Sequence, residues 1–348
     1  MALNVAEADF DNIKQNLIDF LRSQDEFKDY DYSGSAMNII LDVLAYSTHY
    51  TAVHANMNIN EMFLDTAKLR SSVVSKAKEL GYTPKQFTGS TATVTLTADL
   101  SGETIPAQVD VPKGIRFTGT NEDGTSFNFV TDDAYILAAQ GGDIFSGDVD
   151  IVEGTSVSEN WIYDVNNPVN FVLINDTIDT ATLIVTVRDF DGSTNVTTKI
   201  LSTSLALLNQ DAEAYFLQET SDGYMEIYFG DGNLGKALIN GNVVEITYNT
   251  SKGIASNSIS AFSLINDIGI YSKTKFSNST VSSAIGGADR ETIESIKHVA
   301  PKNYQAQNRC VTKDDYKAIL LRENSNIKSA NVWGGETETP PRYGRFFI

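Results

Sequence analysis

The chain has 348 residues, of which 41% are hydrophobic and 20% are charged. This length suggests two or three domains at roughly 150 residues per domain, and the composition is that of a globular protein rather than a disordered one. The formal net charge of -19 argues against nucleic acid as a partner, because most of the surface would repel phosphate groups.

Three features of the sequence indicate the cellular compartment in which the protein folds. Residues 1–10 have neither a basic start nor an apolar stretch, so no Sec-type signal peptide is expected. No run of about 18 apolar residues exists to span a bilayer, so no membrane partner is expected. The single cysteine, Cys310, excludes an internal disulfide framework and fits assembly in a reducing cytosol.

Residues 1–88 predict a helical domain. A first helix is indicated by apolar residues at three- and four-residue steps, namely Phe10, Ile13, Leu17, Phe20 and Leu21. A second helix is expected to begin at Ser35 as its N-cap, to carry Leu41 on an apolar face and to run towards Met57. A third is expected to stop at Gly81 in a left-handed conformation. Three helices cannot bury all of these faces against one another, so Phe10, Leu17 and Leu41 are candidate interface residues.

A β-rich domain is predicted at about residues 89–265. Over residues 91–97 the apolar period changes to two, as in a half-buried strand. Further strands are predicted at residues 127–130, 182–187, 226–229 and 243–248, separated by turn-forming residues. The centre is therefore expected to be mostly antiparallel β, with an inserted β subdomain at about 120–225. The acidic segment 143–159 is expected to be a loop or an excursion within that subdomain.

Residues 266–329 predict a linker and a helical domain. One helix is expected to pass through Ile293 and Ile296 and to end at Pro301, and another is expected to begin at Thr312, whose hydroxyl can cap it. Residues 330–348 predict the start of a short α/β portion, apparently incomplete, with strands at 330–333 and 345–348. The fold class is therefore α+β, multidomain.

The sequence stops on an apolar strand that contains Phe346 and Phe347. An uncovered apolar edge strand promotes aggregation. We therefore expect either that a longer protein continues here or that partners cover the end, and Phe346 and Phe347 are further interface candidates.

Residues 230–236 (GDGNLGK) match the G-x-x-x-x-G-K pattern of a phosphate-binding loop. Such a loop needs a Ser or Thr next to the lysine and then a helix whose amides face the phosphate. Here Ala237 follows, and a predicted strand comes after it. The pattern is better explained as a tight β connection, and no nucleotide site is predicted.

Other residue types with chemical potential also lack the spacing that a site needs. The three histidines, His49, His54 and His298, have no metal-ligand spacing. Residues 122–124 and 189–192 resemble fragments of calcium loops but do not continue to a closing glutamate, so they are expected to be turns. Cys310 is expected to be a small buried hydrophobe rather than a nucleophile. The sequence therefore predicts no catalytic residue, metal, cofactor or small-molecule substrate.

Several segments, taken in order, resemble the baseplate J-like family. They are residues 60–67 and 78–84, residues 229–235 with 240–242, residues 286–291, 300–301, 307–309, 311–312 and 314–316, and residues 332–336 with 340–344. The residues that carry the resemblance are Gly81, Gly230, Asp231, Gly232, Gly235, Arg309, Thr312, Asp315, Tyr316, Trp333, Gly334 and Gly335. Within the family, their combination looks closest to the large wedge subunits of T-even-type phages. Those relatives continue beyond the point where this sequence stops.

The resemblance implies a structural, non-enzymatic subunit of a contractile phage tail baseplate wedge. Such a subunit would sit in the inner ring around the hub and tail tube of the virion and relay the conformational change that triggers sheath contraction. The implied partners are other wedge subunits, further copies of the chain and a sheath-initiating baseplate protein with a lysozyme-like fold. Assembly would take place in the host cytoplasm.

Two alternatives come from other classes of protein. The Thr- and Asn-rich strands and the low pI also suit a β-rich, glycan-binding adhesin of the virion surface, which predicts exposed aromatic platforms and no ordered role for residues 1–88. A nucleotide-dependent enzyme would use residues 230–236 and would lose nucleotide binding on Lys236→Ala.

Overall fold

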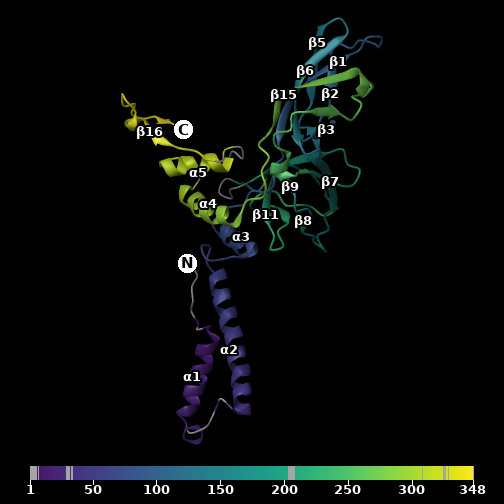
Figure 1. The fold of residues 1–348 in the computed structure, drawn as a ribbon. Helices are drawn as coiled ribbons and strands as arrows, with labels where there is room; N and C mark the ends of the chain where they lie inside the picture. Colours follow the sequence, from purple (N-terminus) through teal and green to yellow (C-terminus); the bar gives the residue numbers. More distant parts are fainter. Residues whose placement is uncertain are drawn as a thin grey trace. The chain divides into compact units, whose positions relative to one another are not determined.

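A computed structural model describes residues 6, 8–28, 32, 34–202, 208–307, 309–323, 327 and 329–347. Asn308 and Ile348, which belong to segments discussed above, lie outside these residues. The chain forms two compact units, Met1–Leu80 and Gly81–Ile348. Helices come first, β-strands fill the centre, and helices with short strands follow, which confirms the predicted α+β multidomain class (Figure 1).

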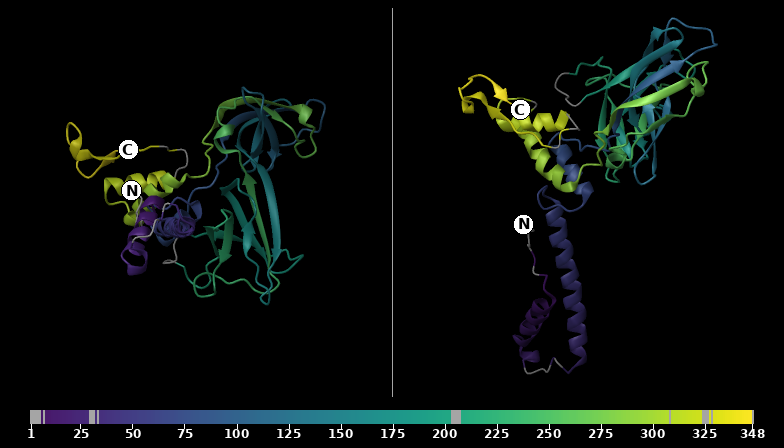
Figure 2. Two further views of the ribbon diagram at one scale, coloured as in Figure 1. Left: turned by 60° about the horizontal axis from the view of Figure 1, so that its bottom comes forward. Right: turned by 45° about the horizontal axis from the view of Figure 1, so that its top comes forward.

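The N-terminal unit contains the helices α1 (Phe10–Arg22), α2 (Ala36–Glu61) and α3 (Arg70–Glu79), with the short 3-10 helix η1 (Asp25–Phe27). The Asp9 side chain caps α1 by accepting a hydrogen bond from the Asn12 amide at 3.0 Å. Helices α1 and α2 lie side by side (Figures 1 and 2). Their contact buries Ile13 on α1, and an ion pair joins Lys14 to Asp42 at 2.6 Å.

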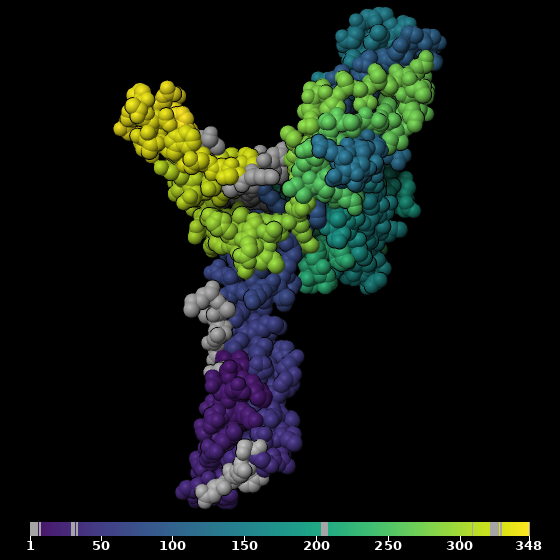
Figure 3. Space-filling view, viewed as in Figure 1, coloured from purple at the N-terminus to yellow at the C-terminus, as the bar shows by residue number. Residues whose placement is uncertain are grey.

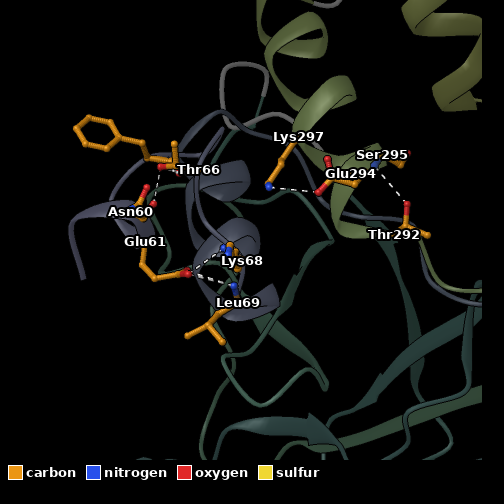
Figure 4. Close-up of polar contacts among 10 residues, drawn as sticks. Asn60, Glu61, Thr66, Lys68, Leu69, Thr292, Glu294, Ser295 and Lys297 are labelled. Atoms are coloured by element: carbon orange, nitrogen blue, oxygen red, sulfur yellow. Dashed lines mark hydrogen bonds and ion pairs between the residues drawn. The ribbon is translucent and has the colours of Figure 1, made fainter. Parts of the chain in front are cut away.

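The ends of α2 and α3 explain how the chain turns between them. Ser35 is the N-cap of α2 as expected, but its hydroxyl is buried and makes no capping hydrogen bond, so that part of the prediction is wrong. The Glu61 carboxylate accepts hydrogen bonds from the Lys68 amide at 2.9 Å and the Leu69 amide at 3.2 Å, ahead of α3 (Figure 4). Helix α3 stops where Gly81 adopts a φ of 70°, as predicted, because glycine takes this conformation without strain.

In the C-terminal unit, one sheet has eight strands in the order β14-β3-β4-β6-β1-β15, with β2 and β5 attached beside β6. The strands are β1 (Thr91–Asp99), β2 (Val109–Val111), β3 (Arg116–Thr120), β4 (Ser126–Thr131), β5 (Tyr135–Gly141), β6 (Ile144–Glu153), β14 (Phe262–Leu264) and β15 (Phe276–Ile285). The alternation predicted from residue 91 is confirmed, since Ala92, Val94 and Leu96 are buried. These side chains form one apolar core with Phe117 and Phe129.

A second sheet of seven strands has the order β7-β13-β9-β10-β11-β12-β8. The strands are β7 (Thr155–Ile162), β8 (Phe171–Leu173), β9 (Ile178–Arg188), β10 (Val196–Leu201), β11 (Ala214–Glu219), β12 (Met225–Phe229) and β13 (Val243–Thr250). All of them fall between β6 and β14 of the first sheet, so the second sheet is an insertion, at 155–250 rather than the expected 120–225. Its strands pair antiparallel except β10 with β11.

Residues 143–159 do not form the loop that was one of the two expectations; they contain all of β6 and the start of β7. The acidic residues in this segment led to the expectation of a loop, although Asp148 and Asp150 occupy alternate positions of a strand. Phe145 and Val149 of β6 are buried, whereas Asp148 and Asp150 point to the other face. There each aspartate accepts a hydrogen bond from a threonine hydroxyl of β1 at 2.6 Å. A carboxylate with such a partner is compatible with a strand.

Helices α4 (Ile293–Ala306) and α5 (Lys313–Glu323) follow the sheets. Thr292 caps α4 by accepting from the Ser295 amide at 3.3 Å (Figure 4). The prediction that Pro301 ends this helix is wrong, because α4 continues to Ala306 and stops only where Gln307 has a φ of 47°. A proline removes one hydrogen bond from a helix. Burial of Ala300 and Ala306 on either side of the proline favours the continued helix.

The last described residues form a short hairpin, β16 (Trp333–Gly334) paired antiparallel with β17 (Phe346–Phe347). A further 3-10 turn, η4 (Gly335–Thr337), follows β16 directly, and η3 (Lys273–Lys275) precedes β15. The predicted pair of terminal strands is therefore present, although each strand is shorter than expected.

Leu96→Ala should lower the free energy of unfolding by about 3 kcal/mol, because it leaves a cavity among fully buried side chains. The matched control, Val281→Ala, removes apolar atoms from an exposed position of β15 and should change it by less than about 0.5 kcal/mol. Urea unfolding followed by circular dichroism measures both. Equal losses in the two variants would contradict the assignment of this core.

Candidate functional site

Helix α2 carries a continuous row of exposed apolar side chains. They occur at alternating steps of four and three residues, at Ile39, Val43, Tyr46, Tyr50, Val53 and Met57. Their exposed fractions range from 42% for Val53 to 67% for Ile39. This is the spacing of the a and d positions of a coiled coil, and we call the six residues the α2 stripe.

The α2 stripe does not face α1. The residues of α2 that are buried within the unit, Leu41, Ala45 and Ala52, lie on a different side of the helix. Within the N-terminal unit, α1 lies along one side of α2 and leaves another side open (Figure 3). A helix with apolar residues on two faces exposes more apolar surface than a single folded chain normally leaves uncovered.

The structure changes the set of interface candidates predicted in the helices. Leu41 is only 2% exposed, so it belongs to the core of the N-terminal unit and is not an outward contact. Phe10 and Leu17 are half-buried. Sequence reasoning missed the α2 stripe, because apolar residues occur around most of α2 and the side that α1 covers is fixed only by tertiary packing. The heptad spacing was the signal that could have identified it.

The C-terminal candidates lie in a small aromatic cluster. The Phe346 ring lies 4.5 Å from the Tyr316 ring of α5, and the Phe347 ring stacks on Trp333 at 6.0 Å. Phe346 remains 44% exposed and Phe347 is half-buried. Both residues therefore retain accessible apolar surface.

The residues of this region that carry the family resemblance lie close to that cluster and fix the local backbone. Thr312 and Asp315 cap α5 reciprocally: the Asp315 amide donates to the Thr312 hydroxyl at 3.2 Å, and the Thr312 amide donates to the Asp315 carboxylate at 2.8 Å. A Cβ atom on Gly335 would lie 2.0 Å from the Arg342 carbonyl oxygen. One on Gly334 would lie 1.9 Å from the Glu336 carboxylate. Arg309 is exposed and donates to the Gln307 side chain at 2.6 Å.

Residues 230–236 form a closed turn. The Asp231 carboxylate accepts from the Asn233 and Leu234 amides at 2.9 Å each, and these bonds lower the pKa of Asp231. The Gly232 amide donates to the Gly235 carbonyl at 3.0 Å, and the φ angles of the two glycines are 87° and 85°. A Cβ on Gly230 would lie 2.3 Å from the Gly235 carbonyl group. The Gly232, Asn233 and Leu234 amides therefore bond within the turn, and the Gly235 and Lys236 amides donate to the Asn209 and Ala212 carbonyls. The turn is followed by strand β13 and not by a helix.

Lys236 is paired within the protein. Its amino group lies 2.6 Å from a carboxylate oxygen of Glu213, whose other oxygen contacts Lys199. Desolvation acts to raise the pKa of Glu213, but hydrogen bonds from the two lysines outweigh it and lower that pKa. The Glu213 carboxylate in turn raises the pKa of Lys236. The lysine of the phosphate-loop pattern thus neutralises a structural glutamate.

The remaining candidates take ordinary structural roles. His49 contacts the Ala8 carbonyl oxygen at 2.5 Å, and His298 lies 2.6 Å from the Lys302 amino group. Cys310 is exposed, so the prediction of a buried cysteine is wrong, because the connection between α4 and α5 does not pack against the core. Within the described ranges, no cluster of three or more His, Cys, Asp or Glu side chains has metal-binding geometry. No described helix combines the length and apolar character required to cross a membrane.

Lys236→Ala should leave ATP binding unchanged, because the amides of residues 232–236 already donate within the protein and Lys236 pairs with Glu213. Isothermal titration of the wild-type chain and the variant with Mg-ATP should give no heat of binding in either. Saturable binding to the wild type that is lost in the variant would contradict this account of residues 230–236.

Glu213 should make stability depend on pH. Because its folded-state pKa is lowered, its contribution is present above the unfolded pKa of about 4.3 and is lost as the pH falls through the folded value. Glu213→Gln should therefore lower the melting temperature near neutral pH and reduce its drop between about pH 5 and pH 3. An undiminished drop in the variant would assign the pH dependence to other carboxyl groups.

Comparisons with known proteins identify relatives for both ends of the chain. Residues 9–82 match the family model described as the helical domain of baseplate wedge protein gp6-like proteins. Residues 312–348 match the model described as C-terminal domain I of baseplate structural protein gp6.

The baseplate wedge protein gp6 of Enterobacteria phage T4 is 29% identical over 345 residues, covering 92% of this chain and 51% of the relative. The chain therefore spans about half the length of the curated relative that it matches.

Two solved baseplate assemblies align more weakly. A chain of the anti-feeding prophage baseplate is 12% identical, with a TM-score of 0.38 over 98% of this chain and 70% of that one. A chain of the type VI secretion TssK-TssF-TssG baseplate subcomplex is 9% identical, with a TM-score of 0.36 over 81% of this chain and 80% of that one. At these scores neither adds to the assignment, which rests on the sequence matches. The chain is thus similar to a baseplate wedge protein along 92% of its length; residues 9–82 match a gp6-like wedge helical domain, and residues 312–348 match gp6 C-terminal domain I.

Proposed function

We propose that the chain is a structural subunit of the baseplate wedge of a contractile phage tail, located in the virion at the tail baseplate. The observation that carries this proposal is the alignment with a phage wedge protein over 345 residues at 29% identity, which covers 92% of this chain. The matches to a gp6-like helical domain and to gp6 C-terminal domain I lie towards the two ends of the chain, at residues 9–82 and 312–348. Kinship with the wider baseplate J-like family is part of the same proposal.

The α2 stripe supports a role in assembly. Six exposed apolar side chains at heptad spacing suit packing against helices of other subunits, including further copies of this chain. Phe346 and Phe347 offer a second, smaller apolar contact. Partners of this kind are other wedge subunits and, as the family resemblance implies, a sheath-initiating baseplate protein with a lysozyme-like fold.

The proposed role is mechanical. The subunit would form part of the inner ring around the hub and tail tube and relay the change that triggers sheath contraction. A relay of this kind needs interfaces with two stable arrangements and a binding event that favours one of them. The pairing of Lys236 with Glu213 supports a non-catalytic role, since it removes the strongest enzymatic candidate.

The adhesin alternative is not favoured. It gives residues 1–88 no ordered role, whereas residues 10–79 contain three helices and residues 9–82 match a wedge helical domain. An adhesin platform would need exposed aromatic rings that lie together. Tyr228 of β12 is exposed but stacks on the buried Phe216, and the exposed Phe190 lies in the connection between β9 and β10.

Deleting the gene for this chain should yield particles without functional contractile tails, and negative-stain microscopy of the lysate would show this directly. Supplying the Lys236→Ala variant in trans should restore the tails, because the proposed role needs no nucleotide. Normal contractile tails in the deletion would refute the wedge role, and failure of the folded variant to restore them would argue for chemistry at residues 230–236.

Val43→Glu and Tyr50→Glu should each weaken incorporation of the chain into baseplates at least about tenfold, because a charge replaces an apolar contact in the α2 stripe. Thr51→Glu is the matched control, since Thr51 is exposed on α2 but lies off the stripe. Quantitative mass spectrometry of purified tails measures incorporation, and circular dichroism checks that the helices remain folded. Equal incorporation of all three variants would remove the stripe from the interface.

A further inference from the structure

The chain enters and leaves the two sheets through segments that pair with each other. Residues 82–90 form the incoming segment and residues 286–292 the outgoing segment. Thr88 and Ala288 exchange two backbone hydrogen bonds, at 2.9 and 3.0 Å, and the Glu291 amide donates to the Lys85 carbonyl at 3.0 Å. The β region is therefore a long excursion that is closed at its base.

Three consecutive side chains of the outgoing segment contact different elements. Asp289 accepts a hydrogen bond from the Ile254 amide at 3.0 Å, in the 3-10 helix η2 (Gly253–Ser256) that follows β13. Arg290 donates to the Glu219 carboxylate at 2.5 Å, at the end of β11, and to the Gly223 carbonyl at 2.6 Å, in the turn to β12.

Glu291 connects the incoming segment to α4. One carboxylate oxygen accepts from the Tyr82 hydroxyl at 2.8 Å and from the Lys85 amide at 3.1 Å. The other accepts from the Ser295 hydroxyl, in the first turn of α4, at 2.6 Å. A single side chain thus bridges the start of the β excursion and the helix that follows it.

The contact between Arg290 and Glu219 is buried. The Glu219 side chain is 0% exposed and that of Arg290 20% exposed, and Gln86 of the incoming segment donates to the second Glu219 oxygen at 2.9 Å. Removing one partner of a buried ion pair leaves an uncompensated charge, so such a contact strongly resists separation. It fixes the second sheet to both segments at the base.

Close backbone packing reinforces the same place. A Cβ on Gly253 would lie 2.2 Å from an Asp289 carboxylate oxygen, and one on Gly287 would lie 2.5 Å from the Gly253 carbonyl oxygen. Asn257 both donates to the Gly287 carbonyl, at 2.8 Å, and accepts from its amide, at 2.9 Å. The outgoing segment therefore has little room to slide.

We propose that Asp289, Arg290 and Glu291 form a mechanical joint that fastens α4 to the incoming segment and to the second sheet, so that a displacement of α4 moves the second sheet with it. Force applied to α4 then passes across the base through side chains and need not travel along β15. The joint follows from these contacts alone and does not depend on the proposed function.

Pulsed electron spin resonance distances test the joint. Spin labels on Thr198→Cys in β10 of the second sheet and on Gln305→Cys in α4, in a Cys310→Ser background, occupy exposed positions. The unaltered joint should give one narrow distance distribution, and Arg290→Met should broaden it roughly twofold. Arg188→Met is the matched control, because it removes an arginine that pairs with Glu245 at 3.5 Å within the second sheet. A distribution that Arg290→Met leaves unchanged, or that the control broadens equally, would overturn the joint.

A second variant keeps the test decisive if Arg290→Met alone prevents folding. Glu219→Met with Arg290→Met removes both charges at once and avoids an unpaired buried carboxylate. In that double variant, hydrogen exchange of the Thr88, Ala288 and Glu291 amides should be faster by about tenfold or more, with β1 and β13 unchanged. Unchanged exchange at the base would refute the joint, as would an equal rise throughout the sheets.

Discussion

Burial of apolar surface is the main force that holds the chain together. The chain buries most of this surface in its own cores but leaves one apolar face of a helix exposed. Both sheets bury their apolar faces in cores of their own, one around Leu96 and Phe117 and the other around Val185 and Ile246. Helix α2 buries only the face that carries Leu41 and Ala45. The stripe from Ile39 to Met57 stays exposed at a spacing that suits packing against further helices, which is why we propose that other subunits cover it.

The proposed joint and the α2 stripe would meet complementary needs of the assembling subunit that we propose. A stripe of apolar residues gives association but no direction of movement. A buried ion pair and a bridging carboxylate are directional, because their hydrogen bonds fix both distance and angle. Within the C-terminal unit, Arg290 and Glu291 concentrate these directional contacts where the chain leaves the sheets. A subunit that relays a change of shape needs both kinds of contact. A movement at one interface reaches another interface only if the subunit between them is rigid.

The local sequence pattern predicted the fold well where the apolar residues of a helix or strand repeat at a single spacing. The strand at Thr91–Asp99 and the stop at Gly81 follow from alternation and from glycine's access to positive φ. Prediction failed where a partner distant in sequence decides the outcome. Threonines of β1 accommodate Asp148 and Asp150 in a strand, and buried alanines on both sides of Pro301 accompany a helix that runs through it. Neither effect can be predicted from the few residues next to the position in the sequence.

The candidate surfaces show the same division. The turn at 230–236 was predictable, because the missing Ser or Thr and the missing helix are local features. Leu41 was misplaced and the α2 stripe missed, because the choice between two apolar faces is made by α1. The contacts of Arg290 with Glu219 and of Glu291 with Tyr82 join residues far apart in sequence, and no single-sequence pattern reports them.

The most direct test of the central claim is cryo-electron microscopy of the assembled tail. If the chain is a wedge subunit, its density should lie in the ring that surrounds the tail tube, with the α2 stripe packed into a bundle with helices of neighbouring subunits. Density for the chain in a fibre or on the outer surface of the particle, with the stripe exposed to solvent, would contradict it.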